Sequence, residues 1–352
     1  MSWGGTGHYK INSAVSLSFN QEMNQFSSWV ETLADHASDA DIRKQWDNNE
    51  APKHYIDIDN YSEFISNGTI PQTLSGAISA HGSTFVYDNG ILPWATITAY
   101  DSLKSCFERL DWDKAVLFAS DLGHYVADGH MPLHITRNYD GDYTGNDGIH
   151  SRFESTMINT YISQITYSGD YIGEISDVNQ YVFDYIYNNY QYVESVIAAD
   201  DYATNINSDI YSSEYKSALW NYSKNFTILL FKNASHALTE LIYTAWLQAG
   251  SPVMNPTGID NPITEPTVVL QQNFPNPFSN STKVQFSLNQ NTKIILQVKD
   301  IQGNTVVEII NDVKSEGNYS FDINTENLSS GIYYLTLDTD KEHSVKQMIL
   351  VR

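Results

Sequence analysis

The segment from His124 to His134 carries the residues of this chain best suited to metal chemistry. It reads HYVADGHMPLH and holds three histidines and one aspartate. Imidazole nitrogens and carboxylate oxygens together suit Zn²⁺, and no cysteine is required. His124 and Asp128 are four residues apart, which places both on one face of a helix. Pro132 is expected to end that helix, so His134 follows where a loop can fold it back toward the same face.

A second pair of the same kind follows in the stretch GNDGIHSRFES. His150 and Glu154 are again four residues apart, at the start of another helical run. Any one such pair has an ordinary explanation, since a histidine and a carboxylate at this spacing stabilise a helix. Two helices that each present a histidine and a carboxylate also build metal sites in all-α proteins. Two pairs together therefore predict a metal site.

Further candidate ligands lie upstream in three short stretches. WGGTGH contributes His8, LADHASDADIRK contributes His36, Asp39 and Asp41, and APKHYIDID contributes His54, Asp57 and Asp59. Each is a type of residue that zinc accepts, so the possible ligand set extends over the first half of the chain.

Charge and composition bound the classes of function. The formal net charge of the 352 residues is −23, and residues 264–352 account for only −3 of it. This acidity argues against binding a nucleic-acid backbone through a basic face, and it suits cation binding. No apolar run has the length of about 18 residues that a membrane span requires. The one cysteine, Cys106, excludes an intramolecular disulfide, and its surroundings favour packing over a nucleophilic role.

The elements that must position these residues change in type along the chain. Apolar residues at helical spacing, as in residues 26–37, 111–130 and 217–250, predict a mainly α domain over residues 1–249. Residues 250–267 are rich in proline and glycine and are typical of a linker. Short alternating segments separated by turns then predict a small all-β sandwich over residues 268–352.

The order of the candidate ligands resembles that of a superfamily uniting bacterial zinc-dependent phospholipases C with fungal zinc single-strand nucleases. The shared pattern is a tryptophan, a histidine, an aspartate before a second histidine, HxxxDxxxxxH, and HxxxE or HxxxD. The matching residues are Trp3, His8, Asp39 or Asp41, His54, His124, Asp128, His134, His150 and Glu154. The resemblance covers about residues 3–250 and implies a helical-bundle catalytic domain.

The resemblance implies three zinc ions. The ligands of the first would be His54, His124, Asp128 and either Asp39 or Asp41, between which the sequence does not decide. The ligands of the second would be His134, His150 and Glu154. The third would use the Trp3 main chain, His8 and the other oxygen of Asp128, which then bridges two ions.

The third zinc site departs from the family pattern. In the family the tryptophan supplies its free α-amine, whereas Met1 and Ser2 precede Trp3 here. These two residues resemble a replacement for a removed signal peptide, so the third site is expected to be weakened. His130 is interpreted as a residue beside the ligands or at the surface. His36, His81, His236 and His343 match no family position and are interpreted as ordinary residues.

The implied chemistry is hydrolysis of a phosphodiester by metal-activated water. Metal ions neutralise the phosphate oxygens, acidify water and stabilise the leaving oxygen. Asp128 would bridge two ions, and the less tightly bound of Asp39 and Asp41 would assist as a general base.

The sequence points to two substrates. Glu154 and the gap of 16 from His134 to His150 resemble the phospholipase branch. The four residues between Trp3 and His8 resemble the nuclease branch. Tyr55 and Asp57 stand where nucleases hold a base, although phospholipases have similar residues there and an aromatic ring also contacts choline.

Phospholipase C-like activity on a phospholipid head group is the favoured interpretation. A single-strand nuclease or 3′-nucleotidase is the alternative. A zinc-binding surface protein without turnover is the third possibility, and the altered N-terminus is the only feature that favours it.

The last part of the chain resembles the C-terminal sorting domain of the type IX secretion system of Bacteroidetes. The resemblance rests on two stretches, LQQNFPNPFSNSTKVQFSL and the final GIYYLTLDTDKEHSVKQMILVR. The resemblance spans about residues 268–352 and implies export through the periplasm and the outer membrane, with that secretion machinery as partner. It also implies a signal peptide in the native precursor and a secreted or surface-attached enzyme. A β carbohydrate-binding or adhesion module is the alternative.

Overall fold

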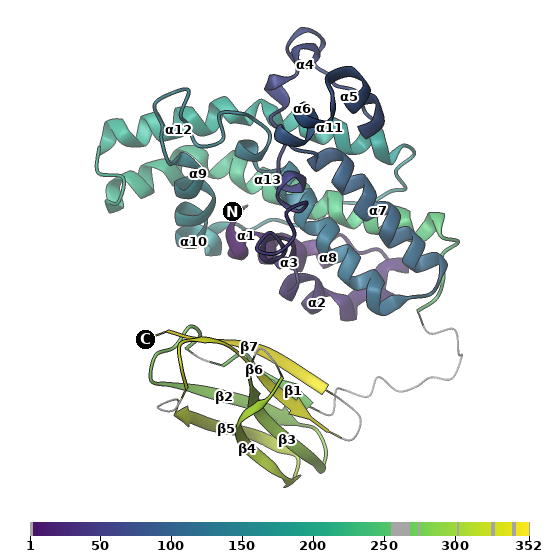
Figure 1. The fold of residues 1–352 in the computed structure, drawn as a ribbon, viewed down its shortest axis with the longest axis vertical. Helices are drawn as coiled ribbons and strands as arrows, with labels where there is room; N and C mark the ends of the chain where they lie inside the picture. The colour runs from purple at the N-terminus through teal and green to yellow at the C-terminus, as the bar shows by residue number, and fades with distance from the viewer. Residues whose placement is uncertain are drawn as a thin grey trace. The chain divides into compact units, whose positions relative to one another are not determined.

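The chain folds into two compact units, Met1–Pro256 and Thr257–Arg352. The computed structural model describes residues 3–254, 268–273, 275–300, 303–324, 328–339 and 343–351. Within these residues the first unit is helical and the second consists of strands (Figure 1). The predicted fold class, a mainly α domain followed by an all-β domain, is confirmed. Most of the predicted linker, residues 255–267, lies outside the described residues.

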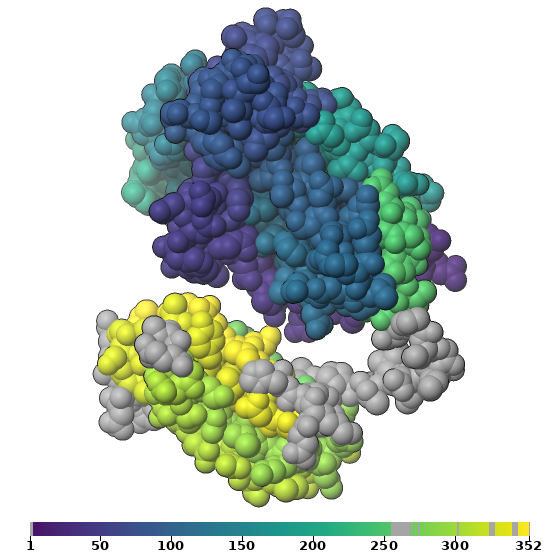
Figure 2. Space-filling view, turned by 45° about the vertical axis from the view of Figure 1, so that its right-hand side comes forward, coloured from purple at the N-terminus to yellow at the C-terminus, as the bar shows by residue number. Residues whose placement is uncertain are grey.

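The α-helices of the first unit vary from single turns to a helix of 36 residues. Their bounds are α1 Gly4–Ser13, α2 Val30–Asp35, α3 Asp39–Arg43, α4 Ser62–Asn67, α5 Leu74–His81, α6 Ser83–Asp88, α7 Leu92–Glu108, α8 Trp112–Gly129, α9 Ile149–Ser151, α10 Ile158–Tyr161, α11 Val178–Tyr190, α12 Tyr192–Ile206 and α13 Ser213–Gln248. In the space-filling view, the blue segment that contains α4 to α8 covers much of the visible face of this unit (Figure 2).

Short helical turns of other types connect the α-helices. The 3₁₀ turns are η1 Ala14–Ser18, η2 Glu22–Trp29, η3 Ala51–His54, η4 Ile58–Asn60, η5 Pro132–His134 and η7 Ile162–Gln164, and η6 Arg152–Met157 is a π-helical turn. The predicted helical run 26–37 is therefore only partly α-helical. Met23, Phe26 and Trp29 recur every three residues and all are buried, so a helix with three residues per turn aligns them on one face.

Helix α8 lies at the centre of the first unit and packs against α7, α13, α1 and α2. Asn12 of α1 is fully buried and ties these elements together. Its Nδ2 donates to the carbonyl of Leu33 at 3.0 Å and to that of Ser120 on α8 at 3.4 Å. This approach requires Gly123, because a Cβ there would stand 2.2 Å from the Asn12 Oδ1 atom. The sequence thus fixes α8 against α1 one residue before His124.

Helix starts follow side-chain signals in the sequence. Ser212 Oγ accepts from the Tyr215 N–H at 3.1 Å at the start of α13, and Asp177 Oδ1 accepts from the Gln180 N–H at 3.0 Å at the start of α11. Such caps satisfy amide groups that have no partner within the helix. None of the described helices combines the length and apolar character that a bilayer span requires.

The second unit contains two antiparallel sheets. Its strands are β1 Val268–Leu270, β2 Ser281–Leu288, β3 Thr292–Lys299, β4 Thr305–Lys314, β5 Gly317–Asn324, β6 Gly331–Asp338 and β7 His343–Leu350. The strand orders are β1-β2-β5 and β4-β3-β6-β7. Alternating residues of both sheets, such as Val284 and Phe286 on β2 and Leu296 and Val298 on β3, share one apolar core. This arrangement is the predicted sandwich.

Candidate metal centre

Helix α8 ends where the sequence predicts, and the chain then returns to it. Its last residue is Gly129, and Pro132 opens turn η5, whose last residue is His134. His54 is likewise the last residue of a 3₁₀ turn, η3, that contains a proline two residues before it. The two turns are locked together, because His134 Nδ1 donates to the His54 carbonyl at 2.7 Å and the Ile56 N–H donates to the His134 carbonyl at 2.8 Å.

Three buried side chains from two segments, η3 and α8, form a central group, defined here as His54, His124 and Asp128. The Nδ1 atom of His54 lies 2.9 Å from Nε2 of His124 and 3.1 Å from Oδ2 of Asp128. The distance from His124 Nε2 to the same oxygen is 3.3 Å. Ligand atoms from a 3₁₀ turn and from two turns of α8 therefore converge on one point.

The two oxygens of Asp128 face different histidines. Oδ2 faces the central group, whereas Oδ1 lies 3.5 Å from His8 Nε2 and 3.4 Å from His134 Nδ1. The Asp128 side chain is fully buried, and Oδ1 accepts no hydrogen bond within the described residues. A carboxylate in this position has the geometry to bridge two cations.

An outer group is formed by His134, His150 and Glu154. Glu154 Oε2 lies 3.0 Å from His150 Nε2 and 3.5 Å from His134 Nε2. His150 is in α9, whereas Glu154 belongs to the π-helical turn η6. The four-residue spacing was expected to lie on an ordinary α-helix, so the π turn is a local difference from the prediction, of a kind that often occurs at functional sites.

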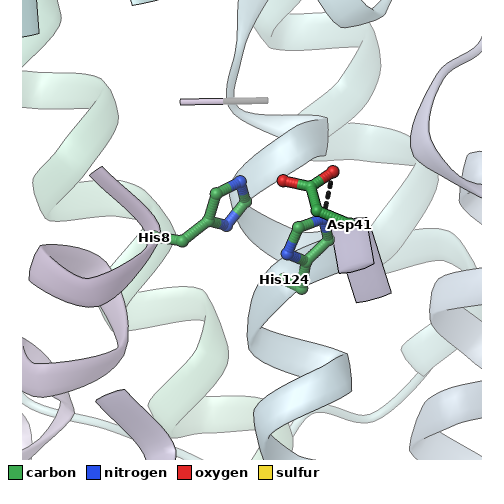
Figure 3. A group of neighbouring side chains, drawn as sticks. All are labelled: His8, Asp41 and His124. Carbon is green, nitrogen blue, oxygen red and sulfur yellow. Dashed lines mark ion pairs between the residues drawn. The ribbon is translucent and has the colours of Figure 1, made fainter. Parts of the chain in front are cut away.

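A third, N-terminal group consists of His8, Asp41 and His124 (Figure 3). The rings of His8 and His124 are stacked with their centroids 3.9 Å apart, and Asp41 Oδ1 lies 3.7 Å from His124 Nε2. Trp3 anchors the start of α1 against α8, because its indole Nε1 donates to the Ala127 carbonyl at 2.8 Å. Ligation by the Trp3 main chain stays a prediction, and Met1 and Ser2 lie outside the described residues.

Asp41 and Asp39 occupy different environments. Asp41 Oδ1 lies 3.6 Å from His54 Nδ1, and its side chain is 21% exposed. Asp39 pairs instead with His36 at 2.7 Å, and its side chain is 44% exposed. Both belong to α3, but two residues along a helix point in directions about 200° apart. The structure thus brings Asp41, and not Asp39, to the other candidate ligands.

Each candidate ligand histidine has one ring nitrogen that points away from the site. The partners of these outward nitrogens explain why a cation fits here. Nδ1 of His124 lies 2.7 Å from the Ala37 carbonyl, and Nδ1 of His150 lies 3.1 Å from the Tyr139 carbonyl. A carbonyl only accepts, so these nitrogens carry protons and the opposite Nε2 atoms of neutral rings present lone pairs. His134 is arranged alike, through the His54 carbonyl.

Lone pairs therefore face one another inside the site. His134 Nε2 and His150 Nε2, whose Nδ1 atoms both donate to carbonyls, are 3.2 Å apart. Both Glu154 carboxylate oxygens are buried without a hydrogen bond within the described residues. Imidazole lone pairs and carboxylates that converge in this way need a shared positive charge, which Zn²⁺ supplies to such a donor set. The residues present fit the implied metal.

The ionisation of these groups reflects the same crowding. Burial and the neighbouring His124 lower the pKa of His8 to about 4. Burial also opposes charge on His124, but the Asp128 carboxylate outweighs it and raises the pKa of His124 to about 9. In return, the histidines hold the pKa of Asp128 well below its usual range despite full burial.

A cleft of about 460 Å³ opens beside the central and outer groups. Its lining residues are Lys44, Ala51, His54, Tyr55, Asp57, Asp88, Leu133, His134, Tyr139 and His150. Tyr55 and Asp57, predicted as substrate-binding residues, thus line the cleft that the candidate ligands His54, His134 and His150 border. Burial and the nearby Asp59 raise the pKa of Asp57 to about 7.

Lys44 is a cleft residue that the sequence reasoning missed. Its Nζ lies 2.5 Å from Asp41 Oδ1, so it places a positive charge at the edge of the metal centre. The signal was available in the sequence, because Lys44 follows Asp41 at the i+3 position of a helical turn.

The other histidines contact none of these groups in the contacts described. His130 is buried, donates from Nδ1 to the Val126 carbonyl at 2.8 Å and stacks on Tyr185. His81 pairs with Glu63 at 2.6 Å, and His236 lies 3.5 Å from Glu240.

Comparison with known families identifies the second unit. Residues 272–351 match the family model of the secretion system C-terminal sorting domain. This match confirms the resemblance predicted for residues 268–352 and indicates export. No curated protein matches the chain.

Two solved structures are similar over the length of the chain. One is the alpha toxin of Clostridium absonum, with a TM-score of 0.45, 9% identity, and coverage of 100% of this chain and 95% of that chain. The other is the alpha-toxin of Clostridium perfringens from an avian strain, with a TM-score of 0.44, 9% identity, and coverage of 99% and 98%. Likeness at this level is weak, so the site is interpreted from its own geometry.

Proposed function

We propose that this protein is a secreted, zinc-dependent phosphodiesterase that hydrolyses a phosphate ester, with phospholipase C-like activity as the favoured form. The observation that carries this proposal is the buried Asp128 carboxylate, whose Oδ2 lies beside His54 and His124 and whose Oδ1 is turned toward His8 and His134. Two of the three groups share His124, and the outer group is separate, which supports more than one ion.

The expected zinc ligands divide among the groups. The first ion would be held by His54, His124, Asp128 and Asp41, the second by His134, His150 and Glu154, and the third by His8 with the bridging Asp128. When bound, zinc supplies positive charge and Lewis acidity to a phosphate ester and to the attacking water.

The protein's own residues then act around the bound phosphate. The ammonium group of Lys44 lines the cleft and would pair with a phosphate oxygen. Asp41 is ionised and partly exposed beside the central group, so its carboxylate can accept a proton from the attacking water. The walls formed by Tyr55 and Tyr139 would exclude bulk water from one side of the substrate.

A single-strand nuclease or nucleotidase remains the second candidate because of Tyr55. Its ring lines the cleft together with Asp57, and its hydroxyl donates to the Asp88 carbonyl at 3.2 Å. A ring held in this way is a platform on which a base stacks. The same ring can instead face a choline head group.

The decisive experiment compares two substrates on the same zinc-loaded full-length chain. Phosphatidylcholine hydrolysis and single-stranded DNA digestion are measured side by side, with a chelator control and an Asp128→Ala variant. Diacylglycerol release without DNA cleavage supports the favoured form. DNA cleavage alone supports the nuclease, and then Tyr55→Ala should raise KM for DNA. Zinc binding with neither activity would favour the non-catalytic surface protein.

A further inference from the structure

Glu50 is a fully buried carboxylate outside the predicted ligand set. It stands four residues before His54, at the start of the 3₁₀ turn that carries this histidine. Its Oε1 lies 3.6 Å from His54 Nε2, the ring nitrogen that faces away from the central group. Within the described residues, His54 Nε2 is buried and makes no hydrogen bond.

His54 differs in this respect from His124, His134 and His150. The outward nitrogens of His124, His134 and His150 each face a backbone carbonyl. The outward nitrogen of His54 faces a side-chain carboxylate instead. If Nδ1 binds a cation, Nε2 keeps its proton, and the carboxylate fixes that tautomer and the orientation of the ring.

Glu50 also contacts neighbours of the other ligands in this part of the site. Tyr125, next to His124 on α8, donates its hydroxyl to Glu50 Oε1. Arg43, two residues after Asp41, donates from Nη2 to the same oxygen at 3.2 Å. Lys53 Nζ lies 2.7 Å from Oε2. One carboxylate thus connects α3, η3 and α8, the three segments that supply Asp41, His54 and His124.

From these contacts we infer that Glu50 is a positioning residue that orients His54 and holds the three ligand-bearing segments of the central group in register. The inference rests on the proposed function, because it assigns Glu50 a role toward the zinc ion of that site. A carboxylate that only neutralised Arg43 and Lys53 would account for two of its contacts but not for the direction of the His54 ring.

The test measures zinc affinity of the full-length chain by competition with a chromogenic chelator, using Zn²⁺ alone. Glu50→Ala should weaken one class of zinc sites by about 10–100-fold, the effect typical of losing such a partner. Glu50→Gln keeps an oxygen acceptor without the charge, so it should restore part of the affinity. Asp121→Asn is the matched control, because Asp121 also pairs with Arg43, at 3.0 Å, but makes no described contact with His54.

A second readout follows the ring itself. In the zinc-loaded parent, ¹⁵N NMR of the histidines should show His54 with a protonated Nε2 and a metal-bound Nδ1. This signature should be lost in Glu50→Ala and kept in Asp121→Asn. Tryptophan fluorescence during unfolding of the metal-free chains checks that each variant folds. If Glu50→Ala does not fold, weaker zinc binding by Glu50→Gln than by Asp121→Asn carries the same conclusion.

Three results would overturn the inference. These are parent-like affinity in Glu50→Ala, equal losses in Glu50→Ala and Glu50→Gln, or an equal loss in Asp121→Asn. Zinc binding and hydrolysis by the parent chain show whether the Glu50 inference alone has failed or the proposed function has failed as well. A parent that binds no zinc overturns both, whereas a parent that binds zinc without hydrolysing either substrate overturns only the activity.

Discussion

At the scale of residues, Asp128 organises the site because its two oxygens serve different neighbours. Oδ2 is shared by His54 and His124, and Oδ1 is turned toward His8 and His134. A buried carboxylate with several histidines and no cation would be costly to maintain, since burial penalises unbalanced charge. The cluster is therefore suited to binding a cation.

The different positions of Asp41 and Asp39 give a matched pair of variants. Asp41→Asn should reduce turnover by about 100-fold or more, because it removes a proposed ligand of the first ion whose carboxylate would also accept the proton, and loss of a general base alone typically costs about 10²–10⁴-fold. Asp39→Asn removes only a half-exposed contact with His36, so turnover should stay close to that of the parent. Steady-state hydrolysis of a generic phosphodiester measures both, and similar rates in the two variants would contradict the assignment.

The raised pKa of Asp57 leads us to expect that the stability of the chain depends on pH. Burial and Asp59 raise the pKa of Asp57 to about 7, so the folded chain binds this proton more tightly than the unfolded chain does. Ionisation of Asp57 therefore lowers the free energy of unfolding at pH values above the unfolded-state pKa of about 4. This loss grows until the pH exceeds about 7.

Asp57→Asn should accordingly raise the free energy of unfolding at pH 8 by about 1–2 kcal/mol, once solvent screening at this partly exposed group is allowed for. At pH 4 the gain should vanish. Urea unfolding at the two pH values measures the difference, and an equal gain at both would mean that the carboxyl is not perturbed.

At the scale of elements, packing against helix α8 fixes the position of α1 relative to the candidate ligands. Gly123 lets Asn12 reach the backbone of α8, and a Cβ there would also stand 2.7 Å from Leu238 Cδ2 on α13. Gly123→Ala should thus destabilise the chain by about 1–3 kcal/mol through overpacking, and weaken zinc binding because His124 is the next residue.

Gly5→Ala in α1 is the control for that substitution. Its Cβ would meet only Ser38 Oγ at 3.4 Å, so the higher helix propensity of alanine should leave stability unchanged or raise it by up to about 1 kcal/mol. Thermal unfolding and zinc titration of both variants decide the point. If Gly123→Ala changes neither the thermal stability nor the zinc affinity, α1 and α8 are not tightly coupled.

Sequence periodicity predicted the long elements well and the short ones poorly. Helices α8 and α13 were predicted within a few residues, because their apolar spacing is sustained over many turns. The 3₁₀ turns η3 and η5 were not, since three or four residues carry no period. The choice between Asp39 and Asp41 depends on how the short helix α3 packs against α8, and the role of Glu50 depends on how η3 folds back on α8.

At the scale of the whole molecule, the two units have separate apolar cores and separate probes. All seven tryptophans lie in the helical unit, between Trp3 and Trp246, so tryptophan fluorescence reports on that unit alone. The predicted zinc ligands also lie there, whereas the core of the sorting domain is formed by its own strands.

Chelation should therefore affect one unit only. Removal of zinc should lower the Tm seen by tryptophan fluorescence, because each site saturated at 100 times its Kd contributes about 2.7 kcal/mol. The calorimetric transition that fluorescence does not follow should stay in place. A shift of both transitions would mean that the two units unfold as one.

The carbonyl groups that face His124, His134 and His150 also bear on when zinc binds relative to folding and export. They turn the three rings toward the site before any ion arrives, so folding does not have to wait for zinc. We expect the folded, empty chain to be a ready receptor, with uptake limited by entry through the cleft. A protein exported by its sorting domain can then cross the cell envelope unloaded and acquire its ions outside. Its activity would follow the zinc supply of the surroundings and not that of the cell that made it.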